Sequence, residues 1–438
     1  MDYVESVTVF GDSGIFNRVY PLLENDYFSR MWPIQEVALS NICVLICGRQ
    51  SLGLPVFLEL LQRFDSNIWS SLILQRTQLH KSLYLHFRSQ SGHPVRHVKA
   101  MFPGVSQLLL YARRHKATEP RDKVFALYGI LRRLGSVLED PDYARSIGSI
   151  YCEASTKAMT FDNHLEILSG LTGAQRPKYC PSWALDLSDD DPINEVGLWR
   201  HYTTPWSNAK PKLKFQISPR TRRLILRGQR MDVLDDIGDA FPDVHTTQGI
   251  TSFSAQACVI NKWLYMFSND FQNQDVLQLL HDAIIGVWSK RSSLDSLNLM
   301  KLLRFWLDPE VLSDSRRSKQ AVLDKGPESL AFNKGQKDRI RLADIIGIAT
   351  LRGMLTQLLD RKVMFRTESG RLGFGSQHVR TGDAIVLLCG ANLPMIVRPR
   401  GRKWAMIAPA YVQGLVRAEG EIPWPAPKKR MLERMVFV

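Results

Sequence analysis

The residues with the clearest chemical potential lie in one short stretch, FSRMWPIQEVALS, at residues 28–40. An arginine, a tryptophan, a glutamine and a glutamate fall within the seven residues from Arg30 to Glu36. Trp32 and Glu36 are four residues apart, so they share one helix face if Trp32 lies in the first turn. The stretch therefore predicts a carboxylate held beside an indole, with Glu36 as the candidate catalytic residue and Trp32 in support.

A short helix and a strand are expected to position these side chains. Pro33 suits the first turn of a helix, where its missing N–H costs nothing. Ile34, Val37 and Ala38 then follow at helical spacing and predict a stripe that faces the core. The β-rich run at residues 42–47 ends at Gly48, so the unit predicts a short helix that leads into a buried strand.

Four ordered stretches carry a resemblance to a known family. FSRMWPIQEVALS resembles the "W-F-x-R-x-W-x-x-Q-E-x-x-L-A" segment of the fungal heterokaryon-incompatibility (HET) domain. Residues 119–130 resemble its "D-P-R-D-K-V-Y-A-L-L-G-L", and residues 181–188 resemble its "P-S-W-x-P-D-W-S". Three further segments, residues 366–375, 382–398 and 410–420, resemble the C-terminal block of long HET proteins. Together these stretches run from about residue 20 to residue 420, and they identify the chain as a member of this family.

Two N-terminal segments of the family pattern have no counterpart in this sequence. The HET domain normally begins with a "Y-x-A-L-S-Y-x-W-G" strand and an "I-D-x-x-C-I-N-Q" strand, whereas this chain begins MDYVESVTVF. The resemblance therefore implies the C-terminal half of a HET domain, in a TIR-like α/β arrangement, with its downstream region. A truncated gene prediction and a degenerate copy of the domain explain the difference equally well.

The resemblance also suggests a chemistry for Glu36. HET domains remotely resemble TIR domains, several of which cleave NAD with a glutamate in a "W-C-x-x-E" helix, and Trp32 and Glu36 reproduce that spacing. Cleavage at the nicotinamide ribose passes through an oxocarbenium-like state that a carboxylate stabilises. The competing interpretation makes Glu36 a surface residue or a partner of Arg30. It is favoured here, because the strands that complete a nucleotide pocket are not found.

Other motif residues favour structural roles. Arg121 and Asp122 begin a predicted helix at residues 121–131, and we interpret them as a hydrogen-bonded charged pair at a loop-to-helix corner. Tyr143 matches the family's "D-Y" position before the next helix. Trp183 follows Pro181 in an extended loop and is predicted to pack in the core, as are Trp32 and Phe125.

Composition and cysteine usage limit the class of protein. With 438 residues, of which 45% are hydrophobic and 23% charged, the chain has the composition of a globular protein. No signal peptide and no membrane-length apolar run is visible. The six cysteines include no CxxC pair, which fits reduced thiols and a cytoplasmic protein. No metal-ligand cluster, P-loop or GxSxG motif occurs, so no metal and no bound cofactor is expected, with NAD considered only as a substrate.

A net charge of +14 raises the question of nucleic-acid binding. Basic residues concentrate at 210–230 and 398–434, but both stretches also fit strands with polar outer faces. No zinc-finger, RNP or helix-turn-helix signature accompanies them. A solvated basic surface is therefore preferred, and nucleic-acid association is the weaker interpretation.

The order of the predicted elements indicates a mixed α+β protein in three parts. Residues 1–190 are assigned to the HET region, 191–360 to a β-hairpin followed by helices, and 361–438 to a small antiparallel β module with a tail. Helices are predicted at 105–114 and 141–159, and a strand at 165–170. The hairpin at 212–235 is expected to join the strands of 363–420 in one sheet or barrel.

Two functions from different classes follow from these observations. The first is a signalling protein of fungal nonself recognition, in which the HET region triggers cell death by assembly or by NAD hydrolysis. The second is a catalytically inert HET relative that acts through protein contacts. Expected partners are other proteins of the incompatibility system or further copies of the chain.

Overall fold

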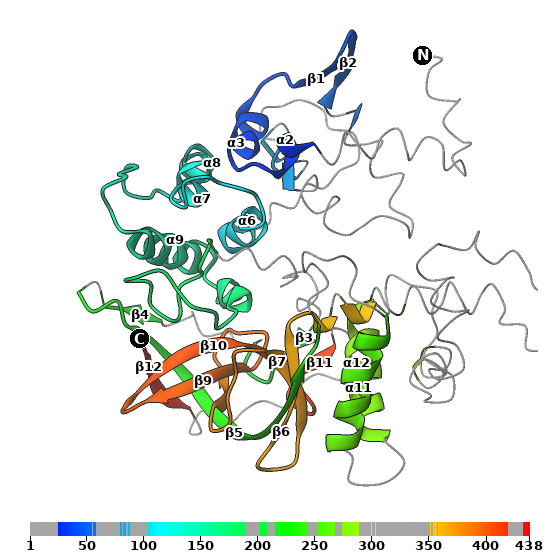
Figure 1. The fold of residues 1–438 in the computed structure, drawn as a ribbon. Coiled ribbons are helices and arrows are strands. Elements are labelled where there is room, and N and C mark those ends of the chain that lie inside the picture. Colours follow the sequence, from blue (N-terminus) through cyan, green and yellow to red (C-terminus); the bar gives the residue numbers. More distant parts are fainter. Residues whose placement is uncertain are drawn as a thin grey trace, which may run out of the picture. The chain divides into compact units, whose positions relative to one another are not determined.

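The computed structural model describes residues 25–54, 104–188, 202–207, 215–242 except 219, 253–267, 274–288, 361–418 and 432–438, with isolated positions at 56–87 and 299–360. These residues form two compact units. The first contains residues up to 163 together with 176–180 and 184–192, and the second contains 164–175, 181–183 and the rest of the chain. The structure is a mixed α+β protein whose C-terminal part is a β sheet, as predicted (Figure 1). The three-part division into 1–190, 191–360 and 361–438 stays a prediction.

The described part of the first unit is mainly helical. Its helices are α2 (Asp26–Ser29), α3 (Trp32–Leu39), α6 (Val105–Ala112), α7 (Asp122–Phe125), α8 (Tyr128–Leu134) and α9 (Ile147–Asp162). In α3, Pro33 lies in the first turn, and Ile34, Val37 and Ala38 are buried, which confirms the predicted stripe. In α6, Leu108, Leu109 and Ala112 are buried, and this helix is also confirmed.

The carboxylate at the end of α9 caps the beginning of α6. Asp162 accepts hydrogen bonds from the backbone N–H groups of Val105 at 2.8 Å and Ser106 at 2.7 Å. Acceptors at this position satisfy N–H groups that have no partner within the helix. Gly104 must precede them, because a Cβ built there would lie 2.4 Å from Oδ1 of Asp162. This contact fixes α6 against α9.

The strand of the first unit departs from the sequence prediction. β1 (Val44–Cys47) forms, but among the described residues it pairs only with β2 (Gln50–Gly53). Ile42 is 81% exposed and Ile46 is 77% exposed. The predicted buried strand is therefore wrong. β1 is half of a two-stranded hairpin, with no described second neighbour to cover its apolar side chains.

Two further local predictions are corrected. The single helix predicted at 121–131 is two helices, because a turn at Ala126 and Leu127, with ψ of −7° and −3°, separates α7 from α8. Residues 165–170 form no strand. They form the 3-10 helix η2 (Glu166–Gly170), in which Ile167 and Leu168, adjacent in sequence, are both buried. The helix predicted at 141–159 begins later, at Ile147, after an N-cap at Ser146 that accepts from the N–H of Ser149.

The second unit contains a sheet that closes on itself (Figure 1). Its ring runs through β10 (Lys403–Val412), β7 (Leu372–Ser376), β6 (Lys362–Thr367), β5 (Leu224–Ala240), β8 (Ala384–Leu388) and β9 (Met395–Arg400), and β9 pairs back with β10. β4 (Gln216–Ile217) pairs with β5, while β12 (Glu433–Phe437) pairs with both β5 and β10. The ring pairings are antiparallel. The predicted recruitment of the 212–235 hairpin into this sheet is confirmed.

The long strand β5 joins the two halves of the barrel. Residues 228–233 pair with β8, and residues 234–240 pair with β6. Register shifts follow Arg230 on the β8 side and Leu234 on the β6 side. Such bulges bend a strand and increase its twist, which is what closure of a small barrel requires.

Three strands of this barrel, β6, β7 and β8, are buried on both faces. In β6, Val363 and Phe365 belong to the barrel interior with Ile385 and Ile396. Met364, between them, instead joins an outer cluster. Since side chains alternate along a strand, a continuous apolar run is the expected sequence for a strand covered on both sides.

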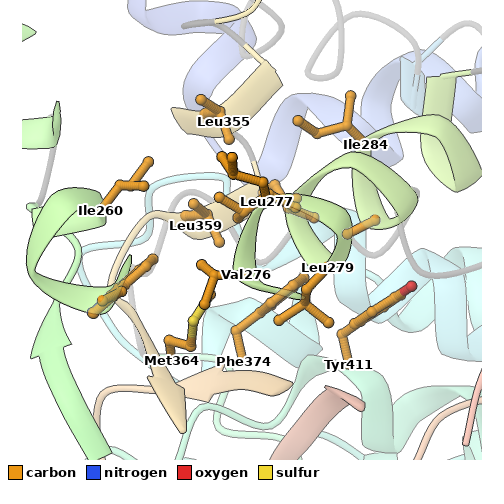
Figure 2. Packing of buried hydrophobic residues seen from close by; sticks show 14 of the residues in the cluster. Ile260, Val276, Leu277, Leu279, Ile284, Leu355, Leu359, Met364, Phe374 and Tyr411 are labelled. Atoms are coloured by element: carbon orange, nitrogen blue, oxygen red, sulfur yellow. The ribbon is translucent and has the colours of Figure 1, made fainter. Parts of the chain in front are cut away.

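The outer cluster packs helices against the barrel. α11 (Phe253–Phe267) contributes Ile260, and α12 (Gln274–Trp288) contributes Val276 and Leu279. Figure 2 shows these residues around Phe374 and Tyr411, whose rings stack with centroids 4.9 Å apart. β3 (Tyr202–Thr203) and β11 (Arg417–Ala418) form a separate short pair at the edge of this region.

The predicted burial of the aromatic residues is confirmed for two and wrong for the third. Trp183 is 0% exposed, and its indole N–H donates to the carbonyl of Arg222 at 2.9 Å. Phe125 is 6% exposed. Trp32 is 39% exposed, because it stands at the start of α3, on the opposite side from the buried stripe.

Candidate functional site

The N-terminal end of α3 is held by the residues that follow α6. The N–H of Met31 donates to the carbonyl of Lys116 at 3.0 Å, and the N–H of Lys116 donates back to Ser29. This pair of bonds makes a short parallel bridge between Arg30 and Lys116. The start of α3, and with it the backbone of Trp32, is therefore fixed to a segment far away in sequence.

The carboxylate of Asp122 joins two aromatic side chains from separate elements. The indole N–H of Trp32, on α3, donates to Oδ2 at 3.3 Å. The hydroxyl of Tyr143, in the loop before α9, donates to Oδ1 at 2.7 Å. Three residues from three motif stretches therefore meet at one point, which we name the Trp32–Asp122–Tyr143 cluster.

The cluster lies at the surface. Trp32 is 39% exposed and Tyr143 is 53% exposed, while Asp122 is partly exposed. The Tyr143 ring packs edge-on against Phe125, with centroids 5.0 Å apart. Packing against Phe125 and the hydrogen bond to Asp122 together fix the position of the Tyr143 side chain.

The phenol of Tyr143 stays protonated under ordinary conditions. Its hydrogen bond to Asp122, partial burial and the charges of Asp122 and Glu119 raise its pKa to about 12. A protonated phenol keeps donating to the carboxylate. Asp122 is thus held by two neutral donors across the physiological pH range.

Glu36 lies outside this cluster. It is exposed on α3, one turn after Trp32, and its side chain has no hydrogen bond or ion pair with the described residues. Burial raises the pKa of Tyr27, and the charge of Glu36 adds to that shift. Burial also raises the pKa of the Cys43 thiol, again with a contribution from Glu36. The charge of Glu36 therefore acts on Tyr27 and Cys43, and its predicted catalytic role stays a prediction.

The predicted pairing of Arg121 with Asp122 is wrong. Arg121 instead binds Glu119 at 2.6 Å and donates to the carbonyl of Arg145 at 2.9 Å. Tyr151 donates to the carbonyl of Pro120 at 2.7 Å. A charged pair does fix this loop-to-helix corner, but the acidic partner of Arg121 is Glu119. The carboxylate of Asp122 is therefore available to bind Trp32 and Tyr143.

Two other motif residues have clear structural roles. The side-chain oxygen of Gln35 accepts from the N–H of Gly129 at 2.7 Å. A Cβ at Gly129 would lie 2.7 Å from that oxygen and 2.9 Å from Leu39, so α3 and α8 approach closely only with glycine there. Lys123 is buried and donates to the carbonyls of Arg113 and His115. The motif residues therefore fall into two groups: those that hold neighbouring segments together, and the exposed Trp32–Asp122–Tyr143 cluster.

The sequence had located each member of the cluster without predicting that they meet. Trp32 and Asp122 are ninety positions apart, and no periodicity links them. The usable signal was their membership in motifs of one family, which suggests a shared location but no particular contact. Among the described residues no group of histidine, cysteine, aspartate and glutamate could hold a metal ion.

A shallow hollow of about 570 Å³ lies on the second unit, between β5 and α11. Its lining includes Asp239, Cys258, Lys262 and Tyr265. Lys262 forms an ion pair with Asp239 at 2.6 Å, so these two charges in the lining of the hollow neutralise each other. No pair of catalytic groups converges there among these lining residues.

Comparison with known proteins gives one finding. Residues 345–431 match the family model described as the Het-6 beta-barrel domain. This segment contains β6 to β10 of the closed sheet and the short strand β11, which pairs with β3. β5, which completes the ring, and β12, which pairs with β5 and β10, lie outside the match. No curated protein and no solved structure matches the chain. The match supports a HET-related fungal protein.

Proposed function

We propose that this protein acts in fungal nonself recognition (heterokaryon incompatibility) and cell-death signalling, in the cytoplasm and through protein contacts. The observation that carries the proposal is the Het-6 beta-barrel match over residues 345–431, the segment that supplies most strands of the closed barrel. The ordered motifs of the first unit agree with it. No helix among the described residues is long and apolar enough to cross a membrane.

The first unit supports contact with another protein more readily than catalysis. Its exposed features are the aromatic residues around Asp122 and the apolar hairpin β1–β2. Exposed aromatic and aliphatic side chains are typical of protein interfaces. Glu36, the single candidate catalytic group, stands on the same unit without a described acid or base partner.

Inducible expression in filamentous fungi tests the proposal. The full chain is expressed in strains of different genotype, and growth and dye exclusion are scored after induction. We expect growth arrest and cell death in some genetic backgrounds and normal growth in others. Arrest in every strain, or in none, at matched protein levels would contradict a role in nonself recognition.

Two variants serve as controls in the same strains. Trp183→Ala disrupts the core of the second unit and should abolish the response. Glu36→Ala removes only an exposed carboxylate and should leave the response unchanged if contacts carry the function. Loss of the response in Glu36→Ala, with normal protein levels, would instead favour NAD cleavage.

A further inference from the structure

We propose that the Trp32–Asp122–Tyr143 cluster binds an arginine side chain presented by a partner protein. This inference rests on the proposed function and specifies the chemistry of the contact. An exposed carboxylate framed by an indole and a phenol offers what a guanidinium requires, namely an anion to pair with and aromatic faces to lie against.

The geometry leaves the carboxylate available. A carboxylate has about four acceptor sites on its two oxygens, and here one site on each oxygen is occupied, by Trp32 at 3.3 Å and Tyr143 at 2.7 Å. The remaining sites belong to a side chain that is partly exposed. The two neutral donors fix the orientation of the carboxylate before any partner arrives, which lowers the entropy cost of binding.

The charge of Asp122 is not neutralised within the cluster. Both of its hydrogen-bond donors are uncharged, and among the described residues no lysine or arginine forms an ion pair with it. The adjacent Arg121 is committed to Glu119 at 2.6 Å. A fixed, uncompensated carboxylate is a site of local negative potential in a chain whose net charge is +14, and the matching ligand is a cation.

Arginine fits this arrangement better than lysine. A planar guanidinium can lie against an aromatic face while its N–H groups reach an adjacent carboxylate. An ammonium is a compact, strongly hydrated charge, and it loses more hydration for the same pairing. Trp32 and Tyr143 each expose more than a third of their surface, so both rings are accessible to a planar group.

The experiment uses the full chain labelled with ¹⁵N at its tryptophans and three short blocked peptides. The peptides differ only at a central arginine, lysine or citrulline, the last being a neutral analogue of arginine. The chain has ten tryptophans, and Trp32→Phe identifies the indole N–H signal of Trp32. We expect the arginine peptide to shift that signal with a Kd of about 1 mM or somewhat tighter, the lysine peptide to bind more weakly, and citrulline to leave it unchanged.

Conservative variants separate the site from general charge effects. Asp122→Asn keeps the shape and removes the charge, and it should weaken arginine binding about tenfold. Tyr143→Phe keeps the ring but releases the carboxylate, and it should weaken binding about threefold. Asp239→Asn, at an exposed carboxylate of the second unit, is the matched control and should have no effect.

Defined results would overturn the inference. Equal binding of citrulline, or unchanged arginine binding in Asp122→Asn, would show that the cluster is not a cation site. Self-association of the free chain that Asp122→Asn abolishes would place the arginine on a second copy rather than on another protein. Each of these three results would leave the proposed function standing, since that rests on the Het-6 match and the fungal assay.

Discussion

Two apolar runs of six residues, 42–47 in the first unit and 384–389 in the second, differ in how far the structure buries them. Every residue of β8 (Ala384–Leu388) is buried. β1 (Val44–Cys47), in contrast, carries Val44 at 49% exposure and Ile46 at 77%. β8 has β5 on one side and β9 on the other, whereas β1 pairs only with β2 among the described residues. An apolar run therefore specifies a strand, but its neighbours decide its burial.

The difference extends to what each unit offers to other molecules. The barrel satisfies its backbone by closing on itself, and closure removes exposed edges. An isolated two-stranded hairpin of four residues a side is marginal in water, and its exposed aliphatic side chains suit a contact surface. The second unit thus provides a closed scaffold, and most of the exposed large apolar side chains described, apart from Tyr265 and Met266 on α11, belong to the first unit.

The strongest test of this contrast is Trp183→Ala in the second unit. The indole is 0% exposed and hydrogen-bonded to Arg222, so its loss should lower the free energy of unfolding by about 3–5 kcal/mol. Urea denaturation followed by circular dichroism measures the change. An unchanged unfolding midpoint, with a solvent-exposed fluorescence spectrum in the parent chain, would refute the packing role.

A matched pair of isoleucine variants compares the two strands directly. Ile385→Ala, in β8 and 0% exposed, should cost about 2–4 kcal/mol because it leaves a cavity inside the barrel. Ile46→Ala, in β1 and 77% exposed, should change stability by less than about 0.5 kcal/mol. The two are measured side by side by urea denaturation. Comparable costs for both substitutions would mean that the hairpin is covered in the native protein.

A smaller effect, on pH dependence, is expected from Asp232 in β5. Burial acts to raise the pKa of Asp232, but hydrogen bonds from Ser369, Thr367, the N–H of Val233 and Arg371 outweigh it and hold the pKa below its ordinary value. A carboxyl whose folded-state pKa is depressed stabilises the fold above its unfolded pKa, which is about 3.9. That stabilisation is lost as the pH falls through the folded-state pKa.

Substitution isolates this contribution. Asp232→Asn should reduce stability at neutral pH and flatten the loss of stability below about pH 4, measured by urea denaturation across pH 2.5 to 7. The control is Asp26→Asn in the first unit, whose ion pair with Lys116 has side chains 77% and 66% exposed. Exposed pairs contribute little, so this control should follow the parent curve. If the free energy of unfolding of Asp232→Asn fell as steeply with decreasing pH as that of the parent chain, the assignment would be wrong.

The smallest effect is expected at Glu36. NAD cleavage of the TIR type needs a carboxylate at the sugar together with loops that hold the phosphates and exclude water. The structure shows Glu36 exposed on α3. We expect the purified chain to release nicotinamide no faster than its Glu36→Ala variant. Robust turnover that Glu36→Ala abolishes would assign catalysis to the first unit and reverse its description as a contact surface.

Much of the fold could be predicted because its signals are local or repeat along the chain. The buried stripe of α3 follows from the spacing of Ile34, Val37 and Ala38. The strands after residue 361 follow from apolar runs separated by turn glycines, such as Gly370 with φ 84° and Gly382 with φ 86°. The addition of the 212–235 hairpin to that sheet was also predictable, since an isolated hairpin needs further strands for stability.

The site could be predicted only in its parts. Trp32, Asp122 and Tyr143 each belong to a motif, yet the sequence favoured burial for Trp32 and an Arg121 partner for Asp122. The first failed because Trp32 stands opposite the buried stripe of α3. The second failed because Glu119 reaches Arg121 at 2.6 Å and leaves the carboxylate of Asp122 to the aromatic donors. Which of two neighbouring acids takes an arginine depends on side-chain positions after packing, and sequence spacing does not contain them.

The sequence by itself determined most of the element types, the mixed α+β class and the burial of Trp183, because periodicity, turn residues and side-chain size act within a few neighbouring positions. Tertiary structure alone decided which apolar run is covered, how β5 closes the ring between β6 and β8, and that an indole and a phenol meet at Asp122. These outcomes join residues up to about a hundred and sixty positions apart, such as Arg230 and Val386. Contacts over such separations depend on how whole elements pack, and local propensity carries no information about that packing.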